Sequence, residues 1–280
     1  YMRTLNLGAQ EAAKTAGLKF LSSNSDNKLE KEAQLIDTYI TQGVKAIVLV
    51  PISRTGSIAA IKRATDKGIK VVCAGTVVDS DLPVTQISQA DYSITTMEGK
   101  AAIDTIKKLG NGSKVKMATV AFKSQVPQQS DDRVNGFLDQ VKDYVEIVAQ
   151  QDAWLPEMSL KVTGDIMTAN PDLQVIFAAN EGGTVGAVQA VRNAGKAGKI
   201  MVFGYDTSVQ MCNDLLNKDN ILQSLGAQSP YDVGKAALED AVKAIKGTKV
   251  PATTTLPGSV LLRAKPAEVK AYSEQLKKFQ

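Results

Sequence analysis

Short apolar runs alternate with longer amphipathic segments along the chain. The apolar runs are bounded by Gly, Pro, Asn or Asp, as buried strands are, and cover residues 45–51, 69–75, 114–122, 173–180 and 199–206. The segments between them have helical spacing and often end in Gly, at 55–68, 95–110, 130–144, 181–195 and 229–247. Strands that alternate with helices need crossover connections, so we predict parallel sheets with helices on both faces.

This alternation is interrupted twice, near residues 84–96 and 225–232, and a second series of strands starts near residue 114. A chain of 280 residues exceeds one typical domain of about 100–200 residues. We therefore predict two doubly wound, Rossmann-like α/β lobes joined by a hinge of several strands. The expected lobes are 1–89 plus 229–252 and 90–228 plus 253–280, with one final strand over 253–264 and short crossings, because no low-complexity linker separates them.

Composition removes several classes of function. The 33 basic and 29 acidic residues are spread evenly, without the basic patch that nucleic-acid binding requires. No apolar stretch approaches a membrane span, and no signal peptide is present in the sequence. Histidine, the usual general base and the commonest zinc ligand, is absent, so we predict no enzyme, no metal site and no cofactor. Cys73 and Cys212 form no spacing motif, which leaves a disulfide open.

Polar residues gather where the predicted strands end. In parallel α/β sheets ligands bind beyond the carboxyl ends of the strands, and four such ends carry candidate groups. These are Gly75 with Thr76, the loop 125–132, Asn180 with Glu181, and Asp206. Each polar residue has a structural alternative, since Asn, Asp and Thr also cap helices and an acidic first turn complements the helix dipole.

The glycines at 182, 183 and 186 leave two interpretations open. Glycine-rich turns at helix N-termini bind phosphates, but the spacing here is GGxxG and Glu181 would oppose an anion. The other interpretation is that these glycines let a helix pack closely against a strand.

Trp154 is the only tryptophan and lies in a polar connection, where a core residue is not expected. An accessible indole beside carboxylates and amides suits a sugar ring, which has an apolar C–H face and a hydroxyl edge. The alternative is a tryptophan that wedges its loop onto the lobe.

Together these residues resemble the type I periplasmic sugar-binding proteins, the ribose-binding protein group of ABC transporters. The similarity covers nearly the whole chain. Its most specific stretches are "GAQEAAKTAG" (8–17), "DDRVNGF" (131–137), "ANPDLQVIFAANEGGTVGAVQAVRNAG" (169–195), "VFGYD" (202–206) and "LGAQSPYDVG" (225–234).

The resemblance implies a set of ligand-binding residues. Asn180, Asp206 and Gln228 would bond sugar hydroxyls, and Trp154 and Tyr1 match aromatic positions. Arg133 matches a family arginine that is often structural. The chain departs from the family in two places: Gly75-Thr76 stands where many relatives have Asp-Arg, and Asp131 where they have an arginine. We expect Gly75, Thr76 and Asp131 to line the pocket and to favour a different ligand, such as an amino sugar, a polyol or a differently configured sugar.

The family begins with a strand, whereas this sequence begins at the position of the first helix. Because the first strand of a doubly wound sheet is central, its absence would leave its neighbours a double spacing of roughly 9–10 Å apart. We therefore expect a natural segment of about ten residues, and any signal peptide, to precede Tyr1.

The resemblance implies a monomeric solute-binding protein that closes two lobes on a sugar and delivers it to a membrane permease. It would work in the periplasm, or as a lipid-anchored protein on a Gram-positive cell surface. Two alternatives stay open. One is the effector-binding core of a lactose-repressor-type regulator without its DNA-binding head. The other is a glycosidase that uses Asp131, Glu181 or Asp206, a chemistry that needs a defined carboxylate separation.

Overall fold

The computed structural model describes residues 1–279, which form two compact α/β units. Unit 1 comprises Tyr1–Gln89 and Ser229–Leu256, and unit 2 comprises Ala90–Gln228 and Pro257–Gln280. None of the helices within residues 1–279 combines the length and apolar character that a membrane crossing requires.

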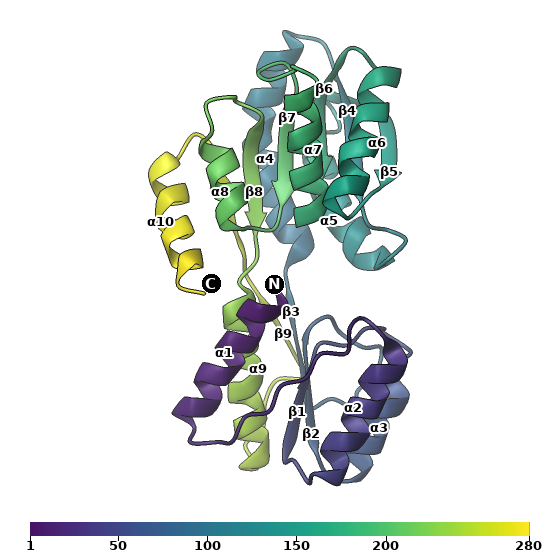
Figure 1. Cartoon of the computed structure of the whole chain (residues 1–280), viewed down its shortest axis with the longest axis vertical. Coiled ribbons are helices and arrows are strands. Elements are labelled where there is room, and N and C mark those ends of the chain that lie inside the picture. The colour runs from purple at the N-terminus through teal and green to yellow at the C-terminus, as the bar shows by residue number, and fades with distance from the viewer. Residues whose placement is uncertain (280) are drawn as a thin grey trace. The chain divides into compact units, whose positions relative to one another are not determined.

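Unit 1 has one sheet of four parallel strands in the order β1-β2-β3-β9 (Figure 1). Its elements are α1 (Met2–Thr15), α2 (Leu29–Thr41), β1 (Ala46–Leu49), α3 (Ile58–Asp66), β2 (Lys70–Gly75), β3 (Thr85–Gln89), α9 (Pro230–Ile245) and β9 (Thr253–Leu256). The expected double spacing is wrong: these four strands are all hydrogen-bonded neighbours, and β1 is an edge strand.

Alternation along β2 assigns the helices of unit 1 to opposite faces. Val71 and Cys73 pack in one apolar cluster with α2 and α3, and Val72 and Ala74 pack in another with α1 and α9. Successive strand side chains point to opposite faces, so a continuous apolar run such as "VVCA" needs cover on both. Helices α1 and α9 lie side by side, and a Cβ added at Gly8 would lie 2.0 Å from the Tyr231 carbonyl oxygen.

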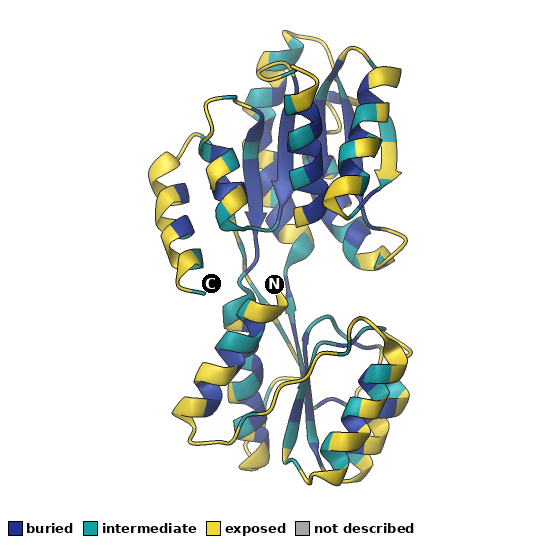
Figure 2. Ribbon diagram, in the orientation of Figure 1, coloured by how far each residue is buried: buried dark blue, intermediate teal, exposed yellow. Residues whose placement is uncertain are grey.

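Unit 2 has a six-stranded sheet in the order β10-β8-β7-β6-β4-β5. Its elements are α4 (Asp91–Gly110), β4 (Val115–Ala121), α5 (Pro127–Val141), β5 (Val145–Asp152), α6 (Pro156–Ala169), β6 (Leu173–Ala178), α7 (Glu181–Asn193), β7 (Met201–Tyr205), α8 (Val209–Leu216), β8 (Leu222–Ala227), β10 (Ser259–Leu262) and α10 (Pro266–Lys277). Helices α4 and α5 cover one face, and α6, α7, α8 and α10 cover the other. Figure 2 shows the central strands buried and the outer helix faces exposed.

The structure corrects two expectations about residues 253–264. This stretch is not one strand: β9 pairs in parallel with β3 of unit 1, whereas β10 pairs antiparallel with β8 of unit 2. Pro257 and Gly258 separate the two strands, because proline cannot donate a ladder hydrogen bond. The third crossing therefore falls after Leu256 instead of at 252–253, and the sheet of unit 2 is mixed, not wholly parallel.

Candidate functional site

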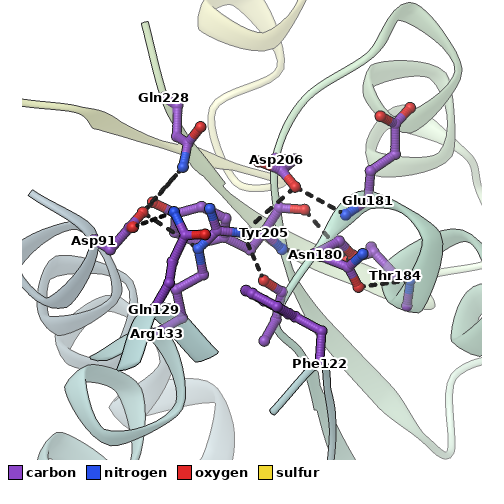
Figure 3. A network of polar contacts seen from close by, with 12 residues as sticks. Asp91, Phe122, Gln129, Arg133, Asn180, Glu181, Thr184, Tyr205, Asp206 and Gln228 are labelled. Atoms are coloured by element: carbon purple, nitrogen blue, oxygen red, sulfur yellow. Dashed lines mark hydrogen bonds and ion pairs between the residues drawn. The ribbon is translucent and has the colours of Figure 1, made fainter. Parts of the chain in front are cut away.

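A buried arginine organises the polar groups at the carboxyl ends of the strands in unit 2. The Arg133 side chain, on α5, is only 6% exposed. Its Nε donates to Asp91 Oδ1 at 3.2 Å, and its Nη1 donates to the Ala179 carbonyl at 3.0 Å and lies 3.6 Å from Asp206 Oδ2 (Figure 3). A buried charge needs such partners, so Asp91 and Asp206 together hold the guanidinium in place.

Two aromatic rings lie close to this guanidinium. Its central carbon lies 4.0 Å from the centroid of the Tyr205 ring and 5.1 Å from that of Phe122. Both distances are within the range of a cation–π interaction. Tyr205 also donates its hydroxyl hydrogen to Asp91, and burial raises its pKa well above the ordinary value, so the phenol keeps this proton.

Asp206 directly follows β7 and has a left-handed backbone, with φ of 73°. Oδ2 accepts the Glu181 backbone N–H at 3.0 Å, which satisfies one of the free N–H groups at the start of α7. Burial raises the pKa of Asp206, and the neighbouring Arg133 partly offsets this rise. Oδ1 takes part in neither contact, and 22% of the side chain is exposed, so this oxygen can accept from a ligand.

Gln228 follows β8 at the same edge of the sheet. Its Nε2 donates to Asp91 Oδ1 at 3.0 Å and lies 3.4 Å from the Tyr205 hydroxyl oxygen. Its Oε1 is buried and has no hydrogen-bond partner. A buried acceptor without a partner costs free energy, and a ligand hydroxyl is one way to satisfy it.

Asn180 is a helix cap in this structure. Its Oδ1 accepts the Gly183 N–H at 3.0 Å, and its Nδ2 donates to the Trp154 carbonyl at 2.9 Å. The cap alternative is therefore confirmed, although the amide also has a second hydrogen and a second lone pair that these bonds do not use.

Trp154 and the glycines of α7 lie together. The half-buried indole packs against the apolar cluster that contains Phe137 and Phe177. A Cβ at Gly182 would lie 2.1 Å from the Trp154 carbonyl oxygen, and one at Gly186 would lie 2.5 Å from Ser159 Cβ. The close-packing interpretation is confirmed: Gly182 and Gly186 pack against the 153–155 loop and α6, and a Cβ at Gly183 would lie 3.7 Å from Ala178 Cβ of strand β6.

Asp131 lies apart from the arginine cluster. Its carboxylate pairs with Lys123 at 3.0 Å; the lysine side chain is 66% exposed and the Asp131 side chain 40%. Residues two apart on a helix do not share a face, which explains why Arg133 is buried while Asp131 faces outward.

Unit 1 brings Tyr1 and Gly75 together. Gly75 ends β2 with φ of 78°, a conformation that residues with a Cβ adopt rarely, and a Cβ there would lie 2.7 Å from Tyr1 Oη. Glycine suits this backbone and leaves room for the Tyr1 hydroxyl. Half-buried Thr76 follows, and its N–H donates to the Ala74 carbonyl at 3.0 Å.

Two groups of this cluster, Asp91 and Tyr205, were not predicted as functional, whereas Gln129 lies within the candidate loop 125–132. Asp91 is the first residue of α4, just after β3, in the stretch where the alternation of strands and helices is interrupted. Gln129 Nε2 donates to Asp91 Oδ2 at 2.9 Å. Only Tyr205 could have been identified from the sequence, because it directly precedes Asp206 at the end of a strand. Within residues 1–279 no cluster of His, Cys, Asp or Glu is arranged to hold a metal ion.

Two Rossmann-like units, with polar groups at the carboxyl ends of the strands, define the type I periplasmic binding protein fold. The family model of the periplasmic binding protein domain matches residues 1–249. The chain belongs to this family, and it is a binding protein and not an enzyme.

Several proteins similar to this chain are named as sugar-binding components of transporters. The ribose import binding protein of Salmonella typhimurium is 30% identical over 253 residues, covering 89% of this chain and 82% of the relative. The D-allose-binding periplasmic protein of Escherichia coli is 29% identical and covers 87% and 80% of the two chains. A solute-binding protein from Actinobacillus succinogenes, solved with bound D-allose, is 27% identical with a TM-score of 0.84 over 94% and 93% of the two chains. These relatives are transport proteins, so they give the regulator alternative no support.

Proposed function

We propose that the protein captures a sugar or sugar-like ligand, namely a monosaccharide, an amino sugar or a polyol, for an ABC importer. The observation that carries the proposal is the cluster around Arg133, which leaves Gln228 Oε1 and Asp206 Oδ1 as acceptors at the carboxyl edge of the sheet. Vicinal hydroxyl groups are the donors that such acceptors match. The names of the ribose-binding and D-allose-binding relatives support the same ligand class.

Each unit supplies part of the proposed site. In unit 2 we assign Asp206, Asn180 and Gln228 to hydroxyl groups, Trp154 to the apolar face of the ring, and Asp131 to the rim. In unit 1 we assign Tyr1, Gly75 and Thr76. A ligand held by one unit would complete its hydrogen bonds when the two units close, and this differential contact would drive closure.

As a member of this family, the protein acts outside the cytoplasm, in the periplasm or an equivalent extracytoplasmic compartment. The finer proposal is that it is a monomer, secreted by a signal peptide or held by a lipid anchor, and that the closed form presents surfaces of both units to a membrane permease. Small-angle scattering with and without ligand tests closure, because an unchanged radius of gyration with a ligand that binds would refute it.

Ligand capture is tested by titration with D-ribose, D-allose, D-xylose, amino sugars and polyols while the fluorescence of Trp154 is followed. A saturable change with one ligand supports the proposal. Asp206→Asn should weaken binding about 10-fold or more, since it removes a charged acceptor while Asn tolerates the left-handed backbone. Asp139→Asn, an exposed change on α5, is the matched control. If neither fluorescence nor calorimetry detects binding of any compound in the panel, the proposal is refuted.

A further inference from the structure

Asp91 accepts hydrogen bonds from four side chains of unit 2. The donors are Arg133 Nε at 3.2 Å, Gln228 Nε2 at 3.0 Å and the Tyr205 hydroxyl on Oδ1, and Gln129 Nε2 at 2.9 Å on Oδ2. An ionised carboxylate only accepts hydrogen bonds, so each neighbour must present an N–H or O–H group to it.

This requirement fixes the orientation of the Gln228 side chain. An amide carries a donating NH₂ group on one side and an accepting oxygen on the other, and the two orientations differ by a 180° turn. Only the orientation with NH₂ toward Asp91 makes a bond; the reverse would place Oε1 against the carboxylate. Gln228 Oε1, which is buried and has no partner, is therefore presented as an acceptor.

Asp91 is itself held firmly enough to impose this choice. The guanidinium that pairs with it lies against the Phe122 and Tyr205 rings, and burial keeps the Tyr205 phenol protonated by raising its pKa. The Gln228 backbone is also fixed, because its carbonyl accepts from the Tyr272 hydroxyl at 3.2 Å (Figure 3 shows Gln228 above Asp91).

We propose that Asp91 is a positioning residue for specificity: by holding Gln228 as an acceptor, it selects ligands that donate a hydroxyl at that place and rejects groups that only accept. The inference rests on the proposed function of the site. Gln228 is the last residue of unit 2, so rotation in the crossing that begins at Ser229 can leave the Gln228 backbone in place and expose its side-chain oxygen to the ligand.

The test uses calorimetry with D-ribose, D-allose and D-xylose, followed by the monodeoxy and monodeoxyfluoro derivatives of the tightest binder. Wild type, Gln228→Met, Asp91→Asn and the Asp139→Asn control are compared. The ring position whose deoxy penalty disappears in Gln228→Met is the one that contacts Gln228. At that position, wild type and the control should bind both derivatives about 10-fold more weakly than the parent sugar. The deoxy derivative lacks the hydroxyl, and fluorine accepts a hydrogen bond but cannot donate one.

In Asp91→Asn the amide of Gln228 is free to turn, so the penalty at this position should fall below about 3-fold. The role of Asp91 is overturned if the fluoro derivative binds wild type like the parent sugar, if folded Asp91→Asn keeps the full penalty, or if no penalty shrinks in Gln228→Met. If Asp91→Asn does not fold, the affinities of the fluoro derivative for wild type and for Gln228→Met still test whether Gln228 acts as an acceptor only. If no sugar of any class binds wild type, the proposed function itself is refuted and the inference with it.

Discussion

Glu98 should make unit 2 less stable as the pH rises. This residue of α4 is fully buried. Ser224 Oγ donates to its Oε1 at 2.5 Å, while Oε2 is buried without a partner. Burial raises the pKa of Glu98 to about 8 from an ordinary 4.5, an effect that hydrogen bonds from Ser224 and from the Gly204 backbone only partly offset. The folded protein therefore holds a neutral carboxylic acid at neutral pH.

The sign of the effect follows from the two pKa values. Below pH 4.5 the group is protonated in both the folded and the unfolded chain, and its contribution to stability is fully present. Between 4.5 and about 8 only the unfolded chain loses the proton, which favours unfolding. The whole interval corresponds to roughly 5 kcal/mol, and the loss levels off above the folded pKa.

Urea unfolding between pH 5 and pH 9 measures this effect. Trp154 is the only tryptophan and packs in unit 2, so its fluorescence reports on that unit. Glu98→Gln keeps the shape of the side chain and does not titrate, and Glu274→Gln changes an exposed carboxylate as the control. The free energy of unfolding of wild type, relative to Glu98→Gln, should fall by roughly 4 kcal/mol from pH 5 to pH 8. Parallel pH profiles of the two proteins would refute the reasoning.

Four further substitutions test packing and the site. Gly136→Ala should destabilise unit 2 by about 1–3 kcal/mol because the new Cβ would lie 2.2 Å from Thr95 Oγ1. Gly164→Ala should stabilise the unit by about 0.5–1 kcal/mol, since no atom lies within 4 Å of the new Cβ. Urea unfolding compares the two variants, and equal effects would contradict this packing. Asn180→Ala should cost about 1 kcal/mol through loss of the α7 cap, and an unchanged thermal midpoint would count against that role. Asp131→Ala should change stability by less than about 1 kcal/mol, since its ion pair is exposed; an unchanged ligand affinity in calorimetry would remove it from the proposed site.

The sequence by itself determined the class of the fold. Continuous apolar strands between helices that end in glycine allow little other than parallel sheets covered on both faces. The rule that ligands bind at carboxyl strand ends directed attention to Asn180 and Asp206, whereas Gln228 was implied only by the resemblance to the family. These inferences depend on local periodicity and chain order, which are written in the sequence.

Only the tertiary structure decided which of these groups have partners. Asp91 and Gln228 are far apart in sequence and meet because α4 and β8 pack in the same unit. The periodicity of the sequence cannot predict that these two residues meet. It also cannot predict that Gly75 has a backbone conformation unfavourable for most side chains, or that Asp131 pairs with Lys123. The division of residues 253–264 between two sheets was also invisible, because strand propensity shows that a segment is extended and not which edge it joins. Hydrogen-bond complementarity between distant residues is a property of the packed chain, and it is what turns a row of strand ends into a polar cluster with defined acceptors.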